Sequence, residues 1–272
     1  MQKRLAFLIV AVSVVALPLA AQAQHKSPLA DAPAIRKRLE LRSTRLELGA
    51  GAATTIGQDF FHSVFIDVKL GFHITDWLSI AAFGGFAVAN LDTGFKTNVV
   101  GSLPPDATNP PTRAPSQGEA TATMNKIQNM FGAQLEVTPF TGKYSLFGKI
   151  FAHYDFYALL GVGALNYAAS GTGNANACTD NGVLAAPPAQ PTPCAVTGLK
   201  LGLNAGVGAH SFINQFLALN FELRDIVAPN NAAGRDVNGD RRVDNNDLTY
   251  GNTFIAALNL VVYFPTTADI SN

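Results

Sequence analysis

One twelve-residue stretch carries residue types and a spacing suited to binding a metal ion. It is DVNGDRRVDNND, residues 236 to 247, with oxygen-bearing side chains at positions 1, 3, 5, 9 and 12 and a backbone carbonyl offered at position 7. The ion Ca²⁺ takes about six to eight oxygen ligands, and this spacing wraps a loop around one ion. The candidate ligands are Asp236, Asn238, Asp240, Arg242, Asp244 and Asp247.

The loop resembles the calcium loops of dockerin modules, whose last ligand is also commonly Asp. It departs from the EF-hand pattern at position 6, where Arg241 replaces the glycine of the sharp turn. A solvated turn rich in Asp and Asn is the alternative, because these residues favour turns in any case. A structural Ca²⁺ that orders the loop is the only cofactor that the sequence suggests.

Two cysteines and five histidines are the remaining reactive residues. Cys178 and Cys194 are the only cysteines; in an exported chain a disulfide between them is expected, with two free thiols as the alternative. The histidines are scattered, and His62–Ser63 and His210–Ser211 are neighbours that point to opposite faces if they lie in strands. No nucleophile elbow, Walker loop or zinc-protease motif is present. An enzyme is therefore not expected.

The N-terminus reads as a secretory signal. Lys3 and Arg4 precede an apolar run from Leu5 to Leu19, and Ala21-Gln22-Ala23 gives a cleavage site. We expect a signal peptide over 1–23 and a periplasmic segment over 24–42, which is either a helical turn or an early strand. No later stretch is long and apolar enough for a spanning helix.

Apolar residues in the mature chain recur with a period of two, which is the period of a strand with one apolar face. In SVFIDVKLGF, Val64, Ile66 and Val68 fall on one face, and Asp67 and Lys69 fall on the other. Eight such segments are predicted, at 43–53, 60–73, 77–90, 125–138, 151–168, 198–210, 215–227 and 250–264. Most are long for soluble strands and suit tilted strands that cross a membrane.

The connections between these segments alternate in length, except that the first external loop, 54–59, is short. Residues 74–76 and 211–214 are short and 139–150 intermediate, whereas 91–124, 169–197 and 228–249 are long and rich in Pro, Asn, Thr and Gly. Short periplasmic turns and long external loops are typical of bacterial outer-membrane barrels. The sequence therefore predicts an all-β fold, an eight-stranded antiparallel up-and-down transmembrane barrel over 43–265, with a tail over 266–272.

The faces opposite the apolar ones contain five positive and five negative groups. An eight-stranded barrel has an interior just wide enough for side chains to fill it, so these charges need partners. We expect a closed polar plug rather than a wide pore. The predicted interior charges are Arg45, Glu47, Asp67, Lys69, Lys126, Glu136, Asp155, Lys200, Glu222 and Arg224.

Some of these charges could instead lie in water at strand ends, and a soluble lipocalin-like barrel would invert the two faces. Low total charge, 14% of residues, favours lipid outside. Trp77, Tyr250, Tyr263 and Phe264 would suit interfacial aromatic girdles. The formal net charge is zero, which gives no electrostatic case for nucleic acid.

Three stretches resemble the outer-membrane β-barrel domain proteins abundant in myxobacteria. They are LELRSTRLELGAGAATTIGQDFFHSVFIDVKLGFHITDWLSIAAFGGFA at 39–87, TPFTGKYSLFGKIFAHYDFYALLGVGA at 138–164 and ELRDIVAP at 222–229. The second contains a Pro-x-x-Gly-Lys turn at 139–143 and a strand start at Tyr154-Asp155. The resemblance implies an eight-stranded, OmpA-like barrel without an established activity.

Together these observations predict a monomeric barrel in the outer membrane of a Gram-negative bacterium, in contact with membrane lipid. A structural or surface-interaction role is expected, with a surface or periplasmic protein as a conceivable partner. The alternatives are a narrow pore or channel and, second, a lipid-modifying enzyme.

Overall fold

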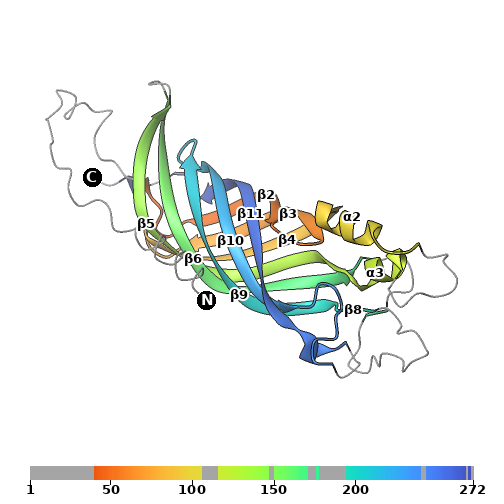
Figure 1. The fold of residues 1–272 in the computed structure, drawn as a ribbon. Coiled ribbons are helices and arrows are strands. Elements are labelled where there is room, and N and C mark those ends of the chain that lie inside the picture. The colour runs from red at the N-terminus through yellow and green to blue at the C-terminus, as the bar shows by residue number, and fades with distance from the viewer. Residues whose placement is uncertain are drawn as a thin grey trace, which may run out of the picture. The chain divides into compact units, whose positions relative to one another are not determined.

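Eight long antiparallel strands close into a single barrel (Figure 1). The computed structural model describes residues 40–105, 116–146, 150–170, 176–177, 194–239, 243–267 and 269–270. The ring order is β2-β3-β4-β5-β6-β9-β10-β11, with β11 pairing back to β2. The strands are β2 Leu46–Ile56, β3 Phe61–His73, β4 Leu78–Asp92, β5 Asn125–Leu146, β6 Ile150–Ala169, β9 Gly198–Phe212, β10 Leu217–Asn230 and β11 Thr249–Phe264.

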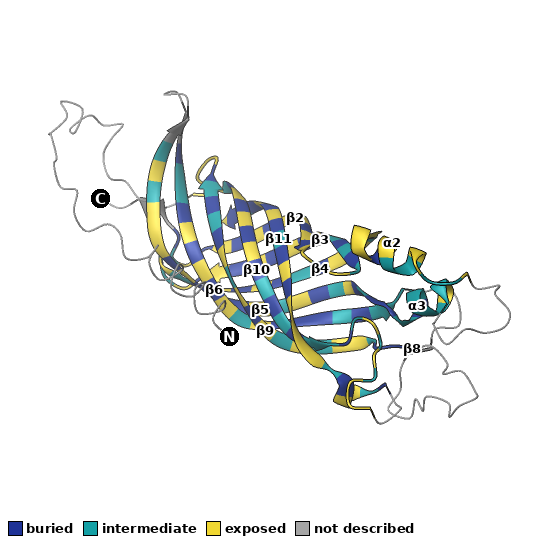
Figure 2. Ribbon diagram, viewed as in Figure 1, coloured by how far each residue is buried: buried dark blue, intermediate teal, exposed yellow. Residues whose placement is uncertain are grey.

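The alternation of residue types along each strand places polar groups inside and apolar groups outside. In β3, Asp67 and Lys69 are buried, while their neighbours Ile66, Val68 and Leu70 are exposed. The same stripes of buried and exposed residues run along every barrel strand in Figure 2. Because successive side chains of a strand point to opposite faces, the alternation of polar and apolar residues fills the interior with polar groups and covers the outer wall with apolar ones.

The predicted fold class is confirmed, and seven of the eight segments coincide with barrel strands to within about three residues, the exception being β5. The prediction was wrong at 139–150, which was expected to be a connection. There β5 runs on to Leu146 and β6 begins at Ile150, so the hairpin is longer than its neighbours. Pro139 has no N–H for the ladder, and the register shifts between Val137 and Phe140.

One end of the barrel carries the long connections and their short elements. The connection between β4 and β5 holds α2 (Gly94–Gly101) and α3 (Gln117–Thr123), and Ser116 caps α3 in a reciprocal capping box with Glu119. Strands β7 (Asn176–Ala177) and β8 (Cys194–Ala195) lie between β6 and β9, and η1 (Asn245–Asp247) lies between β10 and β11. No helix in the part of the chain described by the structure is long and apolar enough to cross a membrane.

The opposite end carries short turns and the two ends of the described chain. There β1 (Glu40–Leu41) pairs with β12 (Asp269–Ile270). The backbone N–H groups of Arg42 and Ser43 donate to the Asp76 carboxylate at 2.7 and 3.0 Å. Of the predicted periplasmic segment 24–42, residues 24–39 lie outside the described residues, as does the predicted signal peptide.

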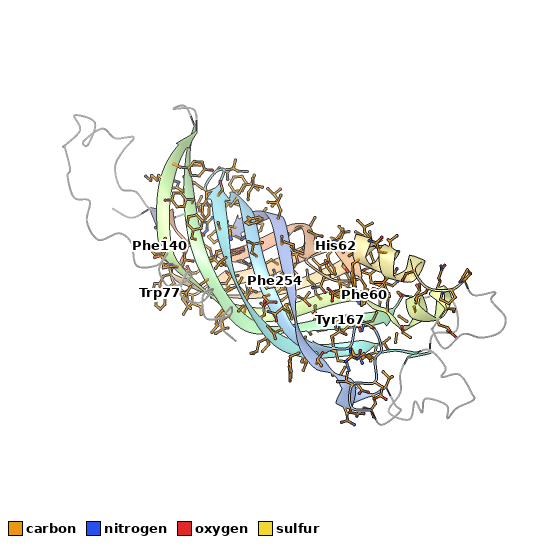
Figure 3. All side chains as sticks on the ribbon, in the orientation of Figure 1. Phe60, His62, Trp77, Phe140, Tyr167 and Phe254 are labelled. Carbon is orange, nitrogen blue, oxygen red and sulfur yellow. The ribbon has the colours of Figure 1, made fainter. Side chains whose placement is uncertain are left out.

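Large aromatic side chains lie near both ends of the outer wall (Figure 3). Trp77 and Phe140 lie towards the short-turn end, and Phe60 lies beside α2, where its ring is 6.0 Å from that of Phe95. Of the girdle residues predicted from sequence, Trp77, Tyr250 and Phe264 are exposed, but Tyr263 is buried inside the barrel. Tyr263 alternates with Phe264, so only one of the two can face outwards.

Candidate functional site

A buried lysine stands at the centre of the barrel interior. Lys69 projects inwards from β3, and its Nζ lies 2.6 Å from Glu136 Oε1 on β5. It also lies 3.4 Å from Glu47 on β2 and 3.4 Å from Glu222 on β10. Because these four side chains are almost completely buried, Lys69 is the shared counter-ion of three carboxylates that water does not screen.

Neutral polar side chains form hydrogen bonds with the same charged groups. The Tyr157 hydroxyl donates to Glu222 Oε2 at 2.7 Å and accepts from Asn220 Nδ2 at 2.7 Å. Ser79 Oγ donates to Glu136 at 3.0 Å, and Gln134 Nε2 donates to the same carboxylate at 2.7 Å. The Lys69 ammonium also faces the Tyr157 ring, 4.6 Å from its centroid. Side chains from six strands, β2 to β6 and β10, therefore join in one network.

A second group of charges lies towards the short-turn end. His210 Nδ1 lies 2.9 Å from Asp155 Oδ1, and its Nε2 lies 3.4 Å from Glu47 Oε1. His73 Nε2 reaches the other oxygen of Glu47 at 3.0 Å, and Arg42 NH1 forms an ion pair with Asp155. Glu47 thus connects this group to Lys69.

An arginine lies at each end of the polar network along the barrel axis. Arg45 donates to the carbonyls of Gln215 and Pro265 at the short-turn mouth, at 2.7 and 2.9 Å. Arg224 NH2 lies 2.5 Å from Glu222 Oε1, and its guanidinium lies 3.7 Å from the Phe83 ring centroid. Among the described residues, the buried interior holds four fixed cations and five carboxylates: Arg42, Arg45, Lys69 and Arg224 against Glu47, Asp67, Glu136, Asp155 and Glu222.

Apolar side chains fill the interior towards the long-loop end. They form one contiguous buried cluster drawn from seven of the eight barrel strands, all except β9. Its members are Ala53, Phe65, Phe83, Ile127, Met130, Leu165, Tyr167, Ile226, Ala228, Ile255 and Ala257. We call this set the apolar layer, and the ionic network beneath it the polar layer. The sequence analysis did not anticipate an apolar layer inside the barrel.

Eight of the ten predicted interior charges are buried in the barrel, and two are not. Lys126 precedes a register shift between Ile127 and Asn129, which turns Ile127 inwards and leaves Lys126 only partly buried. Lys200 lies at the long-loop rim, where its Nζ donates to Asn245 Oδ1 at 3.1 Å. The prediction that both lie inside was therefore wrong, through a bulge in one case and a strand end in the other.

Four titratable groups of this network were not predicted from the sequence: Arg42, His73, Tyr157 and His210. Three of them do follow the alternation, because His73, Tyr157 and His210 share a strand face with Lys69, Asp155 and Gly208 respectively. Only formal charges had been counted on these faces, so the neutral polar groups were passed over. Arg42 precedes the first barrel strand, and no periodicity could place it.

The predicted calcium loop is organised around Asp247, which is 1% exposed. Its Oδ1 accepts from the N–H groups of Val237 and Asn238 at 2.8 and 3.2 Å, and its Oδ2 accepts from Asp244 N at 3.0 Å. Asp236 Oδ1 accepts from Gly239 N at 2.7 Å. Burial by itself would raise the pKa of the Asp247 carboxyl, but the three N–H donors hold that pKa below its ordinary value.

The described members of the predicted ligand set do not form a metal centre in the structure. Asp240 and Arg242 lie outside the described residues. Elsewhere in the described chain, no group of three or more His, Cys, Asp or Glu side chains is placed to hold a metal ion. The Asp247 carboxylate already accepts three backbone N–H groups, which leaves about one of its four acceptor sites for an ion.

The predicted disulfide falls mainly on residues outside the description. Cys178 is one of them, and only the backbone of Cys194 is described. That backbone belongs to β8, which pairs in parallel with β7, and Cys194 lies opposite Asn176. The segment that leads into Cys178 therefore runs beside Cys194.

Neither of the two histidine–serine pairs in the described chain forms a hydrolytic site. His210 pairs with Asp155, but its other ring nitrogen faces Asn220 at 2.7 Å and Glu47, so no nucleophile takes that place. Ser211 points to the outer wall and bonds to Tyr144. Ser63 donates to Asn90 at 2.6 Å on the inner face, while His62 points outwards from the same strand.

Comparison with known proteins returns low similarities. No family model matches the sequence, and no curated protein matches it. Among solved structures, the N-terminal β-barrel domain of Pseudomonas aeruginosa OprF aligns over 82% of this chain and 98% of its own, with 10% identity and a TM-score of 0.41. Outer membrane protein OprG from P. aeruginosa covers 82% of this chain and 97% of its own, at 9% identity and a TM-score of 0.38. Neisserial surface protein A aligns over 80% of this chain and 94% of its own, at 8% identity and a TM-score of 0.37.

Proposed function

We propose that this chain is a monomeric outer-membrane barrel of a Gram-negative bacterium with a structural or surface-interaction role. The proposal is based on the distribution of side chains, which is the reverse of that in a soluble barrel: apolar side chains cover the outer wall and charged side chains lie inside. Leu201 and Leu160 are 70% and 65% exposed on the outer wall, while Lys69 inside is 0% exposed. In water this arrangement would expose a continuous apolar wall and bury charge, whereas in a bilayer both faces meet a suitable environment.

The filled interior supports a role other than bulk transport. The polar layer and the apolar layer succeed one another along the barrel axis, and the side chains of both are buried. An aqueous channel requires a lumen lined by polar groups over its whole length. The apolar layer therefore argues for a plugged barrel and against a narrow pore, and the long loops remain as the surface for a partner.

The long loops are proposed to be stiffened by Ca²⁺ at 236–247 and by a Cys178–Cys194 disulfide. The inward-turned Asp247 and the side-by-side strands β7 and β8 support a compact, ordered loop end. A disulfide that closes a loop of this size contributes about 3 kcal/mol in the chain-entropy model. Both features would act on the loops and leave the barrel wall unchanged.

Mobility in SDS gels with and without boiling tests the proposal. The full chain, purified from outer membranes, is run with Ca²⁺, with chelator and with reductant. A closed membrane barrel resists SDS and changes mobility on boiling, and this shift is the expected result. Absence of a shift under all conditions would instead favour a soluble periplasmic β-protein. Chelator-sensitive and reductant-sensitive loop proteolysis in the unboiled form would support the ion and the disulfide.

A further inference from the structure

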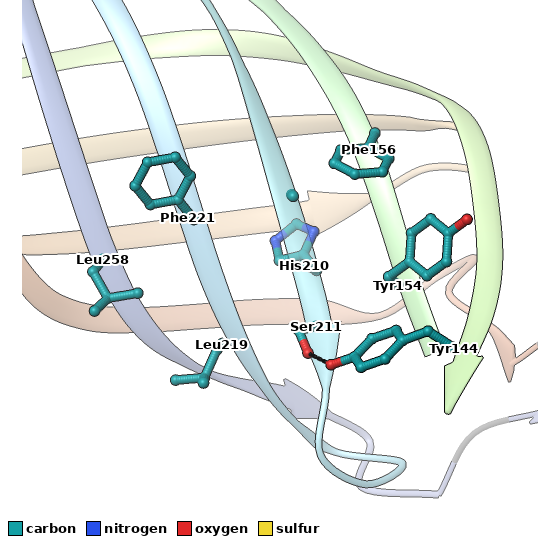
Figure 4. A pocket seen from close by; sticks show the side chains of 9 residues that line it. Tyr144, Tyr154, Phe156, His210, Ser211, Leu219, Phe221 and Leu258 are labelled. Carbon is teal, nitrogen blue, oxygen red and sulfur yellow. Dashed lines mark hydrogen bonds between the residues drawn. The ribbon is translucent and has the colours of Figure 1, made fainter. Parts of the chain in front are cut away.

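A groove of about 510 Å³ lies on the outer wall near the short-turn end (Figure 4). It forms because β5 and β6 extend beyond their neighbours and bring Tyr144 over β9. The Tyr144 hydroxyl lies 2.6 Å from Ser211 Oγ, and the dashed line in Figure 4 marks this bond. The Tyr144 side chain of β5 therefore reaches past β6 to β9.

The groove has a polar end. The hydroxyls of Tyr144 and Ser211 close it, and the Tyr154 ring packs 6.0 Å from that of Tyr144. Gly142 makes this packing possible, because a Cβ at that position would lie 2.6 Å from the Tyr154 ring.

The rest of the groove is apolar. Phe156 of β6, Leu219 and Phe221 of β10 and Leu258 of β11 line it, and they are between 42% and 56% exposed. All four point away from the interior, so the wall of the groove is continuous with the outward apolar surface of the barrel. A volume near 500 Å³ lies within the range of about 300 to 1,000 Å³ seen for small-molecule sites.

We propose that this groove binds one phospholipid of the bilayer, with an acyl chain against the apolar wall and the headgroup at the Tyr144–Ser211 end. The proposal rests on the membrane location proposed above. A concave apolar wall buries more of a flexible chain than a convex barrel surface can, and the hydroxyl groups of Tyr144 and Ser211 suit ester and phosphate oxygens. The opposite ends of the groove thus match the two ends of a lipid.

Photo-crosslinking tests this site. The full chain is reconstituted in vesicles of phosphatidylethanolamine and phosphatidylglycerol that contain a phospholipid with a diazirine in its acyl chain, and labelled peptides are read by mass spectrometry. We expect labelling of Phe156, Phe221 and Leu258 to exceed that of Leu160 and Leu201, outside the groove, by about tenfold, the ratio given by about 1.4 kcal/mol of preference.

Matched variants locate the effect. Ala209 lines the groove, so Ala209→Trp fills it and is expected to remove the excess labelling, whereas Ala133→Trp on the outer face of β5 should leave it unchanged. Equal labelling of groove and non-groove positions in the wild type would overturn the proposal, since it would show annular lipid only. Absence of labelling at every outward position, together with absence of the heat-dependent gel shift, would overturn the membrane proposal as well.

Discussion

Lys69 is the residue on which the interior ion pairs depend. Its ammonium is shared by Glu47, Glu136 and Glu222, and none of the four side chains is more than 2% exposed. Unpaired charges in such a place are costly, and removal of one partner from a buried pair typically destabilises a protein by about 3 to 5 kcal/mol. The network is thus vulnerable at this one position.

Substitution of Lys69→Met is therefore expected to lower the free energy of unfolding by about 3 to 5 kcal/mol, since three carboxylates lose their common cation. The measurement is urea-induced unfolding of the barrel in lipid vesicles. Lys200→Met, at the rim with one hydrogen bond to Asn245, is the matched control and should change stability by less than about 1 kcal/mol. Restoration of stability by the added substitution Glu136→Gln would show that the loss is electrostatic. Equal effects of Lys69→Met and Lys200→Met would contradict this account.

The stability of the loop at 236–247 is expected to depend on pH through the Asp247 carboxylate. Its folded pKa is lower than the unfolded value, so its hydrogen bonds stabilise the loop above the unfolded pKa of about 3.9. This contribution is lost as the pH falls through the folded pKa. Amide hydrogen exchange at Val237, Asn238 and Asp244 should therefore accelerate relative to β10 amides below about pH 4. In Asp247→Asn, whose amide cannot accept on both sides, exchange should already be fast at neutral pH. Unchanged protection in this variant would show that the carboxylate does not order the loop.

At the scale of the strand, close packing inside the barrel depends on glycine. A Cβ on Gly208 of β9 would lie 2.2 Å from the Tyr157 ring, which rests on it. Gly208→Ala must push Tyr157 away and weaken its bond to Glu222, with an expected loss of about 1 to 3 kcal/mol.

The control is Gly251→Ala in β11, where the added Cβ meets nothing within 4 Å. Unfolding of both variants in the same vesicles separates the loss of space from the general effect of alanine in a strand. A loss confined to Gly208→Ala is expected. A loss of the same size in Gly251→Ala would argue against this account, because no clash is expected there.

Strand-scale features also mark the limit of what the sequence could predict. Alternation identified all eight barrel strands, because half-buried strands repeat every two residues. It misplaced Lys126, since the bulge after Ile127 changes the face and leaves no clear mark in the sequence. It also ended β5 too early at Pro139. The proline lies within a register shift of the β5–β6 pairing, and the strand continues beyond it without a turn.

The candidate site was less predictable than the strands. The sequence showed that charges would lie inside, but not which charges would pair. The pairing of Lys69 with Glu136 depends on how β3 lies relative to β5, and that of His210 with Asp155 depends on the register between β9 and its neighbour β6. Such contacts join residues far apart in the chain, so the strand order and register have to be known first. The apolar layer was missed for a related reason: Phe65 and Phe83 read as ordinary strand residues until the direction in which they point is known.

At the scale of the whole molecule, the polar and apolar layers lead to a prediction about ion flow. A hydrated ion has to pass the ion pairs around Lys69 and then the apolar layer, where no group replaces its water. The full chain in a planar bilayer is therefore expected to give no discrete single-channel steps. A variant with Phe65→Ala and Phe83→Ala should stay silent as well, because the polar layer remains. Steps are expected only when Lys69→Ala is added, provided that the triple variant keeps its heat-dependent gel shift. Discrete conductance of the wild-type chain would by itself refute the plug and favour a narrow pore, whether or not the variants fold.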